Sequence, residues 1–341
     1  MRALVSIIIV NWNGLQWLKL CLPSLQKQQY SPVEIILVDN ASTDGSIEWI
    51  RKHYPFVKIH KNAKNLGFSE ANNIGYRAAK GDYILFLNND TTVCSDFLVE
   101  LVRKIESNPD IAGAQSKLLL MDDHARLDAV GAFLTPTGFL FHWGFGQLDR
   151  NKYDKTEDLY TTKGACMMFR RAVLKEVEMH NCIFDPTYFA YFEESDLCHR
   201  IWLTGKRIVY APKSVVYHKM GGTSTGMNNA FIQYHSFKNR IRTYVKNLEW
   251  ENLIKLLPVH LAMCEFFSLT SLFCGNAALS WAIQRAFWWN IRNILSTLQD
   301  RAYIQSTIRK VSDSRIFSRV MRRPRINYYF SLSKGRTSNE T

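Results

Sequence analysis

The chain of 341 residues lacks the short motifs that mark several common classes of enzyme. Its seven cysteines include no CxxC pair, so we expect the reduced thiols of a cytosolic protein rather than a disulfide framework. No glycine-rich GxGxxG sequence and no Walker-type phosphate loop follows the first apolar run, which argues against a dinucleotide-dependent dehydrogenase. Internal repeats and low-complexity blocks are absent as well.

Long, clean hydrophobic runs are also missing. Residues 256–274 come nearest to the roughly 20 apolar residues of a membrane span, but they include Pro258, His260 and Glu265. On this pattern we predict no spanning helix. The apolar run at residues 4–10 is short and ends in Asn-Trp-Asn, so we expect a first strand and not a signal peptide.

Negative charge is scarce in the last third of the chain. From His235 onward, 17 lysines and arginines stand against six aspartates and glutamates, a local charge of +11 within a total of +13. A basic tail favours an anionic membrane surface or nucleic acid as a partner. Because a nucleic-acid partner rests on this tail alone, we predict none.

The first part of the chain alternates apolar runs with segments of helical spacing. We predict strands at residues 4–10, 33–38, 57–60 and 82–87, each followed by a helix. Strict strand–helix alternation is typical of an α/β fold with a doubly wound, mainly parallel sheet and right-handed crossovers.

The second half is less regular. A strand is predicted at residues 111–120, a hairpin over the site within 127–145, and two short strands at 207–210 and 214–217. After Asn229 we expect helices only.

Three of the predicted strands end in polar side chains. These are Asn11 and Asn13, Asp39 and Asn40, and Asn88, Asn89 and Asp90. Ligands of open α/β sheets bind at the carboxyl ends of the strands, so the three ends predict one polar rim with Asp90 in the position of a ligand-binding residue. The alternative for Asp90 is a turn or cap residue before the helix that starts near Asp96.

Seven stretches together resemble those of family 2 glycosyltransferases with the GT-A fold, and most of all the rhamnosyltransferase-like members. They are residues 5–13, 35–46, 65–81, 83–92, 162–169, 192–200 and 216–222. The resemblance implies a GT-A catalytic domain over residues 1–228, with a nucleotide-binding half (1–120) and an acceptor and metal half (121–228). A helical, basic, membrane-associating region (229–341) would follow.

The resemblance implies a nucleotide-sugar donor, a divalent metal and inversion at the anomeric carbon. Asp39 matches the position that binds the pyrimidine ring, where a carboxylate suits a ring N–H donor; helix capping is its alternative role. The donor-binding residues expected from the matching stretches are Asn11, Asp39, Asn65, Gly67, Asn88 and Asn89.

Asp90 and His218 are the expected ligands of Mg²⁺ or Mn²⁺. Asp90 matches the last acid of the family's DxD motif, and these ions prefer oxygen ligands. Asn88 and Asn89 replace the earlier acids, which leaves open a weaker metal site or contact of Asn88 with the ribose. His218 matches a frequent metal-binding histidine, with a purely structural role as its alternative. The loop at residues 221–226 is expected to offer backbone N–H groups to the diphosphate.

Three acids lie close together at the start of a helix predicted over Glu193–Leu203. They match the family's catalytic acidic motif, although a solvated first helical turn is the alternative. An inverting transfer needs one base for the acceptor hydroxyl. By position in the motif we assign this role to Glu194, with Asp196 as the second candidate and Glu193 in support.

The implied enzyme transfers L-rhamnose from dTDP-rhamnose to a lipid-linked saccharide or glycan in cell-surface polysaccharide synthesis. It would be cytoplasmic, peripheral on the inner face of the cell membrane. Alternatives are a UDP-hexose or galactofuranose transferase, or a non-catalytic scaffold that binds a glycan or a partner. The sugar, the acceptor and homo-oligomerisation stay open.

The apolar C-terminal helices have two interpretations. Trp281, Trp288 and Trp289 beside Arg285 and Arg292 fit helices that lie in a bilayer interface. The alternative is a helical bundle that packs on the catalytic domain.

Overall fold

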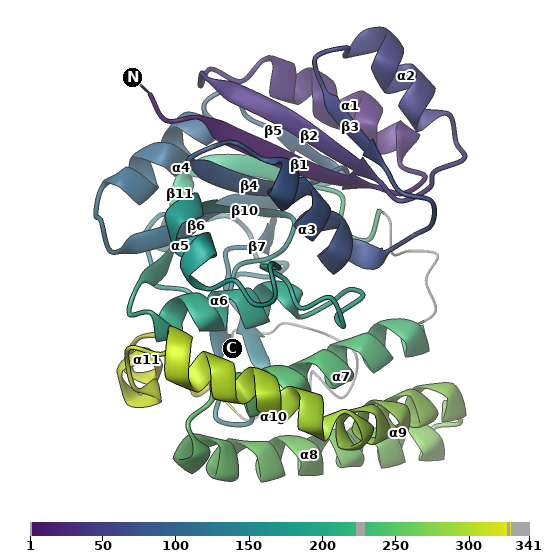
Figure 1. Ribbon diagram of the computed structural model, residues 1–341, viewed down its shortest axis with the longest axis vertical. Coiled ribbons are helices and arrows are strands. Elements are labelled where there is room, and N and C mark those ends of the chain that lie inside the picture. Colours follow the sequence, from purple (N-terminus) through teal and green to yellow (C-terminus); the bar gives the residue numbers. More distant parts are fainter. Residues whose placement is uncertain (1, 223–228, 326–327, 329–341) are drawn as a thin grey trace.

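The computed structural model describes residues 2–222, 229–325 and 328 (Figure 1). The strands are β1 (Val5–Asn11), β2 (Val33–Asp39), β3 (Lys58–Lys61), β4 (Tyr83–Asn88), β5 (Thr91–Val93), β6 (Ile111–Leu120), β7 (Leu127–Ala129), β8 (Ala132–Leu134), β9 (Leu140–His142), β10 (Cys166–Arg170) and β11 (Arg207–His218). The helices are α1 (Leu15–Gln26), α2 (Ser46–His53), α3 (Gly67–Ala78), α4 (Phe97–Glu106), α5 (Arg171–Glu176), α6 (Glu193–Leu203), α7 (Asn229–Asn247), α8 (Trp250–Phe273), α9 (Ala277–Arg292), α10 (Ile294–Tyr303) and α11 (Asp313–Val320), with short helical turns η1 (Asn151–Tyr153) and η2 (Ile304–Ile308).

Within the described residues, nine strands form one sheet in the order β3-β2-β1-β4-β10-β6-β11-β5, with β7 paired to β6. The strands β3, β2, β1 and β4 run parallel, whereas β10 runs antiparallel between β4 and β6. The parallel register places Asn11 beside Asp39 and Val10 beside Asn88. The predicted polar rim therefore forms at one edge of the sheet.

Helices cover both faces of this sheet, because alternate side chains of each strand point to opposite faces. Ile7 and Ile9 of β1 belong to a buried cluster with α1, α2 and α4, while Ile8 belongs to the cluster with α3 and α6. Leu85 and Phe86 of β4 divide between the two faces in the same way. The predicted doubly wound α/β fold is confirmed.

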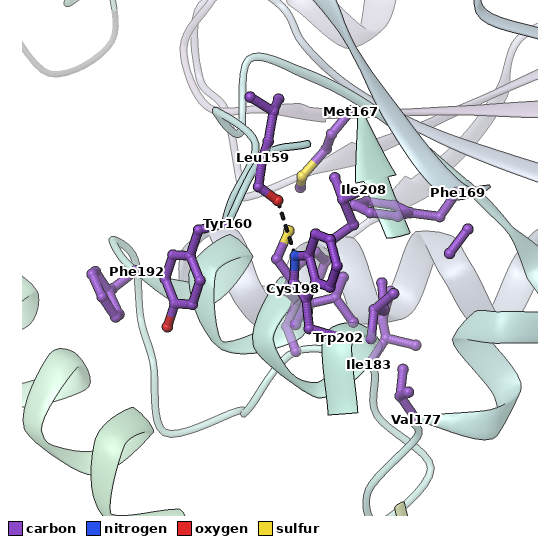
Figure 2. Packing of buried hydrophobic residues seen from close by; sticks show 14 of the residues in the cluster. Leu159, Tyr160, Met167, Phe169, Val177, Ile183, Phe192, Cys198, Trp202 and Ile208 are labelled. Atoms are coloured by element: carbon purple, nitrogen blue, oxygen red, sulfur yellow. Dashed lines mark hydrogen bonds between the residues drawn. The ribbon is translucent and has the colours of Figure 1, made fainter. Parts of the chain in front are cut away.

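Helix α6 has the predicted bounds and is anchored in the larger core. Leu197, Cys198, Ile201 and Trp202 are buried, as the 3–4-residue spacing of an apolar helix face requires. Figure 2 shows the Trp202 indole near Cys198 and Ile208, and its Nε1 donates to the carbonyl of Leu159 at 2.9 Å. This packing fixes the position of the acids at the start of the helix.

The C-terminal region is mainly helical in its described residues, as predicted, but Met321 forms a parallel bridge with Leu134 and residues 322–325 are not helical. Helix α7 contacts α6, α9 and α10, and Figure 1 shows it between the sheet and the layer of α8, α9 and α10. The proposed division of the chain near residue 228 falls in a segment outside the described residues and stays a prediction.

Three local expectations differ from the structure. The strands predicted at residues 207–210 and 214–217 are one strand, β11, with a shift in register between Ala211 and Val215. Strand β5 was not predicted, since three residues carry no periodic signal. Among the described helices, α8 has the length and composition to cross a membrane, whereas the sequence showed no run clean enough to predict a span.

Candidate functional site

A cavity of about 480 Å³ lies at the carboxyl ends of β1 and β4. Its wall also includes the starts of α3 and α6, strand β9, the end of β11 and helix α7. Seven of the ten predicted site residues line it: Asn65, Gly67, Asn88, Asn89, Asp90, Glu194 and His218. The structure does not bring Asn11, Asp39 or Asp196 to this surface.

Asn11 and Asp39 lie beneath the cavity and are joined by a hydrogen bond. The Asn11 Nδ2 donates to Asp39 Oδ1 at 3.1 Å, and Asn89 Nδ2 donates to Asn11 Oδ1 at 2.8 Å. The other oxygen of Asp39 accepts from the backbone N–H of Ser42 at 2.9 Å. A side chain on Gly14 would meet Asn89 Nδ2 at 2.1 Å, so this glycine makes room for the bridge. The direct contact of Asp39 with a donor ring stays a prediction.

The start of α3 is tied to the turn before α6. Phe189 offers its carbonyl to the backbone N–H groups of Phe68 and Ser69, at 2.7 and 3.4 Å. Gly67 has a φ of +81°, and a Cβ there would lie 2.3 Å from the Phe189 carbonyl oxygen. Only glycine combines this backbone conformation with such a close approach. Asn65 caps the same turn by accepting from Gly67 N–H at 2.9 Å.

Asp90 and His218 meet at the end of the cavity formed by β4 and β11. His218 Nε2 lies 3.4 Å from Asp90 Oδ1, and His218 Nδ1 lies 2.7 Å from Asp128 Oδ2. Asp128 in turn accepts from Lys163 Nζ at 2.5 Å. Burial acts to raise the pKa of Asp128, but Lys163 and His218 hold it down at about 2. Burial acts to lower the pKa of His218, but the carboxylates of Asp128 and Asp90 outweigh this effect, so the pKa of His218 is raised.

These groups fit a divalent cation. Asp90 Oδ1 is buried and has no hydrogen-bond partner, while the carboxylate of Asp128 on Nδ1 orients Nε2 of His218 toward the cavity. A histidine held by a carboxylate through its second nitrogen is a common arrangement for a metal ligand. The described residues contain no group of three His, Cys, Asp or Glu side chains around one point. Two protein ligands suit Mg²⁺ or Mn²⁺, which often complete their coordination with water and substrate phosphates.

The turn that presents Glu193 and Glu194 is strained. Tyr191 and Phe192 both have φ values near +70°, a conformation that costs free energy for residues other than glycine. Asn239 of α7 holds this turn, because its Nδ2 donates to the carbonyls of Ala190 and Tyr191 at 3.0 and 2.6 Å. The C-terminal region thus helps to shape the cavity.

Glu193 is buried and Glu194 is half-buried in the cavity wall, so these two acids do not form a fully solvated helical turn. Burial raises the pKa of Glu194 to about 7, against the opposing effect of Lys163 and Arg240. Burial and the nearby Glu194 raise the pKa of Glu193. A carboxylate whose pKa lies near neutrality can accept a proton at physiological pH.

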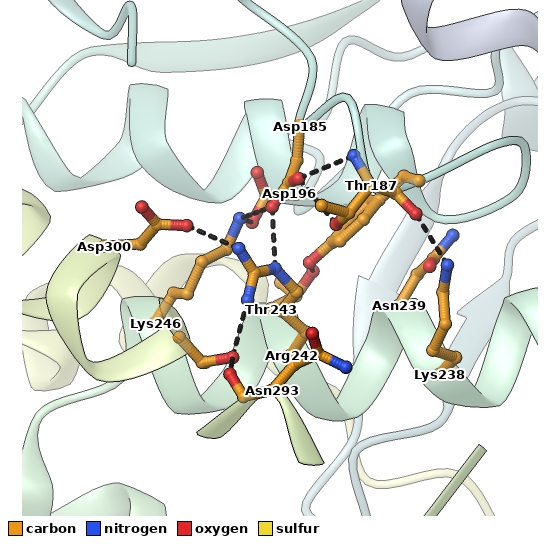
Figure 3. Close-up of polar contacts among 12 residues, drawn as sticks. Asp185, Thr187, Asp196, Lys238, Asn239, Arg242, Thr243, Lys246, Asn293 and Asp300 are labelled. Carbon is orange, nitrogen blue, oxygen red and sulfur yellow. Dashed lines mark hydrogen bonds and ion pairs between the residues drawn. The ribbon is translucent and has the colours of Figure 1, made fainter. Parts of the chain in front are cut away.

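Asp196 lies two residues further along α6 and faces a buried ionic cluster. Its carboxylate is 3.2 Å from Lys246 Nζ and 3.1 Å from Arg200 Nε, and it accepts from Asn247 Nδ2 at 3.0 Å. Figure 3 shows the same cluster extending through Arg242 to Asp300. Burial would raise the pKa of Asp196, but the adjacent Lys246 and Arg200 lower it.

Sequence reasoning missed Asp128, Lys163, Asn239 and Arg240. Asp128 interrupts the apolar run 127–130, which was a readable sign of a functional or paired carboxylate. Lys163 stands inside the matching stretch 162–169, but no role was assigned to it. The two residues of α7 carry no local signal, since only tertiary packing brings them to the cavity.

Comparison with known proteins places the chain in a family. The sequence pattern of glycosyl transferase family 2 matches residues 6–178, half of the chain. A rhamnosyltransferase of Escherichia coli, WbbL, is 30% identical over 231 residues, which cover 63% of this chain and 83% of that protein. The chain therefore belongs to glycosyl transferase family 2. It spans about a third of the length of the first curated relatives that it matches.

Solved structures support the GT-A-like fold. The mannosyltransferase PcManGT of Pyrobaculum calidifontis, in complex with GDP-mannose and Mn²⁺, aligns with a TM-score of 0.52 over 90% of this chain and 86% of that one, at 16% identity. GalNAc-T7 with UDP, GalNAc and Mn²⁺ aligns with a TM-score of 0.60 over 98% of this chain and 59% of that one, also at 16% identity. Both neighbours hold Mn²⁺, which is consistent with use of a divalent metal in this fold.

Proposed function

We propose that the protein is a metal-dependent, inverting glycosyltransferase that moves L-rhamnose from dTDP-rhamnose to a lipid-linked saccharide. The observation that carries the proposal is one cavity that is lined by the Asp90–His218 pair and by the carboxyl of Glu194. The identity shared with the Escherichia coli rhamnosyltransferase supports the choice of sugar.

The donor occupies the edge of the sheet in this proposal. Asn65, Gly67, Asn88 and Asn89 line the cavity on the side of β4 and α3, where they would contact the nucleoside. Asn88 makes no side-chain hydrogen bond within the described residues, so its amide is available to a ribose hydroxyl. Asn11 and Asp39 support this surface from below through Asn89.

Asp90 and His218 would hold Mg²⁺ or Mn²⁺ beside the donor diphosphate. A bound divalent cation neutralises the charge that develops on the leaving diphosphate. The turn that leads into the predicted diphosphate loop lies next to Asp90, since Lys219 N–H donates to the Asp90 carbonyl at 2.9 Å; the Gly222 N–H donates to the Lys219 carbonyl at 2.9 Å within that turn. Residues 223–226 of the predicted diphosphate loop lie outside the described residues.

Glu194 acts as the base. It removes the proton from the acceptor hydroxyl, whose oxygen attacks the anomeric carbon while the bond to the diphosphate oxygen breaks and its electron pair leaves with the diphosphate. One displacement inverts the configuration at that carbon. Lys163 and Arg240 keep part of the carboxyl population ionised against the effect of burial.

Donor turnover across a panel of nucleotide sugars tests the proposal. With Mn²⁺ present, we expect turnover of dTDP-rhamnose to exceed that of UDP-glucose and UDP-galactofuranose. Asp90→Asn should abolish turnover and retain the melting temperature, because it removes a metal ligand and keeps the side-chain volume. Turnover that is equal with and without a chelator would contradict the metal assignment.

A second candidate follows from Asn88 and Asn89, which replace acids of the family pattern. Such a change is also expected in a non-catalytic scaffold that has lost its metal site. A protein that binds dTDP without any turnover, at every metal tested, would favour the scaffold. Preferential turnover of a UDP-hexose would instead favour the alternative sugar and keep the mechanism.

The C-terminal helices are proposed to attach the enzyme to the inner face of the cell membrane. Helix α8 turns one stripe toward the protein, formed by Leu253, Leu256, His260, Cys264 and Ser268. His260 there contacts the Thr137 carbonyl at 3.0 Å. The opposite stripe and the neighbouring helices expose large apolar side chains, among them Ile254, Phe266, Leu269, Phe273, Trp281, Trp288 and Leu295. Because α8 packs on the protein along its length, we favour a helix that lies on the bilayer over one that crosses it.

Vesicle sedimentation tests this attachment. The protein should pellet with anionic vesicles and be partly released by high salt, since each basic residue near such a surface contributes about 1 kcal/mol. The double variant Trp281→Ser, Trp288→Ser should stay in the supernatant, whereas Phe56→Ser, an exposed aromatic next to β3, should pellet like the wild type. Equal pelleting of all three proteins would show that the apolar surface has another partner.

A further inference from the structure

Arg240 on α7 lies in the wall of the cavity, enclosed by aromatic rings. Its guanidinium carbon is 4.8 Å from the ring centre of Phe139, 5.0 Å from that of Phe192 and 5.7 Å from that of Phe237. Stacking on three rings restricts the guanidinium to one orientation. The cation is therefore held in place before any ligand binds.

The same guanidinium makes no ion pair at contact distance within the described residues, and Glu194 acts on it only from further away. No carboxylate within the described residues lies within 4 Å of it, its Nε is buried without a hydrogen-bond partner, and its contact with Ser236 Oγ is long at 3.4 Å. The other cation of the cavity differs, because Lys163 is paired with Asp128 at 2.5 Å. Buried polar groups are nearly always satisfied, so an unpaired arginine at a cavity wall indicates a missing anionic partner.

The position of Arg240 favours the acceptor over the donor. The nucleoside side of the cavity is built by the ends of β1 and β4 and the start of α3, whereas Arg240 packs on Phe139, just before β9, and on Phe192, just before Glu193 and Glu194. Met220 and Phe189 line the cavity as well, and Met220 is half exposed. An anion bound here would have apolar side chains beside it.

We infer that Arg240 forms a subsite for the phosphate of a lipid-linked acceptor. The guanidinium presents several N–H donors in a plane, which matches two phosphate oxygens. The apolar side chains nearby fit the first part of a lipid chain attached to that phosphate. The inference rests on the proposed function, since it assigns the acceptor of the same site.

Binding of farnesyl phosphate to the full-length protein, saturated with dTDP and Mn²⁺, tests the subsite. Arg240→Gln should weaken this binding by about ten- to a hundredfold, the usual effect of losing a charge-assisted hydrogen bond. Arg240→Lys should recover part of the affinity, because it restores the charge without the planar donor pair. Arg103→Gln, an exposed arginine paired with Glu100 on α4, is the matched control and should bind like the wild type.

Three further measurements separate the explanations. Farnesol should bind the wild type and Arg240→Gln equally, and dTDP affinity should be the same in both. Unchanged farnesyl phosphate affinity in Arg240→Gln, or a loss that falls on dTDP instead, overturns the inference. Inorganic phosphate that binds as tightly as farnesyl phosphate also overturns it, because the lipid would then contribute nothing.

The proposed function can fail separately. If the wild type binds neither dTDP nor UDP with Mn²⁺, the enzyme assignment itself is wrong. If nucleotide binds normally but Arg240 has no effect on farnesyl phosphate, only the subsite is wrong. Melting temperatures of both Arg240 variants show whether a loss of binding reflects loss of the fold.

Discussion

Two faces of helix α6 place similar acids in opposite environments. Glu194 points to a cavity where no cation lies within 4 Å of it among the described residues, and burial raises its pKa to about 7. Asp196 points to Lys246 and Arg200 at 3.2 and 3.1 Å, and its pKa is lowered. Burial acts to raise the pKa of both acids, although Asp196 is fully buried and Glu194 is only half-buried in the cavity wall. Direct pairing with cations, and not burial, decides which acid can take up a proton near neutral pH.

One face of α6 carries an acid that stabilises the fold, and the other face carries an acid that meets the cavity. On the face of Asp196, the ion pair with Lys246 joins α6 to α7, and Arg242 of α7 pairs in turn with Asp300 of α10 (Figure 3). The face of Glu194 meets a cavity that a substrate can enter. A reactive carboxyl therefore stands on a rigid support, which is the arrangement that positioned catalysis requires.

The largest effect is expected from Glu194→Gln. Donor turnover should fall by about 10²–10⁴-fold, the usual contribution of a general base, while dTDP affinity and melting temperature stay close to the wild type. Initial rates and calorimetric titration with dTDP measure the two properties. Glu48→Gln, on the far helix α2, is the matched control and should keep full turnover. Turnover of Glu194→Gln within tenfold of the wild type would remove the base assignment.

Asp196→Asn should affect stability instead. Removing one member of a buried ion pair leaves Lys246 and Arg200 partly uncompensated and typically costs about 3–5 kcal/mol. We expect the free energy of unfolding in denaturant to fall by this amount, with turnover at low temperature within tenfold of the wild type.

The double variant Asp196→Asn, Lys246→Met sharpens this test. It should lose less stability than the sum of the single variants, because the two side chains are in contact. A stable Asp196→Asn protein with no turnover would move the base by two residues along α6.

The sequence predicted the parts of the fold that local patterns control. The strands β1, β2 and β4 appear as apolar runs that end in Asn11, Asp39 and Asn88, so the polar rim was readable before the structure. Helix α6 was predicted with its observed bounds, because its acids start the helix and Leu197 and Ile201 follow at helical spacing. The resemblance to the family predicted one site for Asp90, Glu194 and His218, and all three line the same cavity.

Long-range pairing explains what the sequence could not predict. Asp128 reaches His218 across 90 positions because β7 pairs with β6, and β6 with β11. Asn239 and Arg240 reach the cavity only because α7 packs against the turn before α6. The different surroundings of Glu194 and Asp196 could not be predicted from the sequence either, since Lys246 pairs with Asp196 from 50 residues away. Each of these contacts depends on tertiary packing of elements that have no shared local pattern.

The smallest effect, and the most direct comparison of the two faces, is the pH dependence of stability. The pKa of Glu194 is raised from 4.5 to about 7 in the folded protein, so its contribution to stability is complete below 4.5 and is lost as the pH rises through about 7. The pKa of Asp196 is lowered from 3.8, so its contribution to stability is present above pH 3.8 and is lost as the pH falls through the lower folded value.

Glu194→Gln should therefore gain melting temperature relative to the wild type between pH 5 and pH 8, because a glutamine avoids the cost of ionising a carboxyl that burial disfavours in its charged form. Thermal melts at both pH values measure this gain, with Glu48→Gln as the baseline. If the difference in melting temperature between Glu194→Gln and the wild type stays constant or falls as the pH rises, Glu194 ionises in the folded protein without a cost in stability. The contrast between the two faces of α6 would then be wrong.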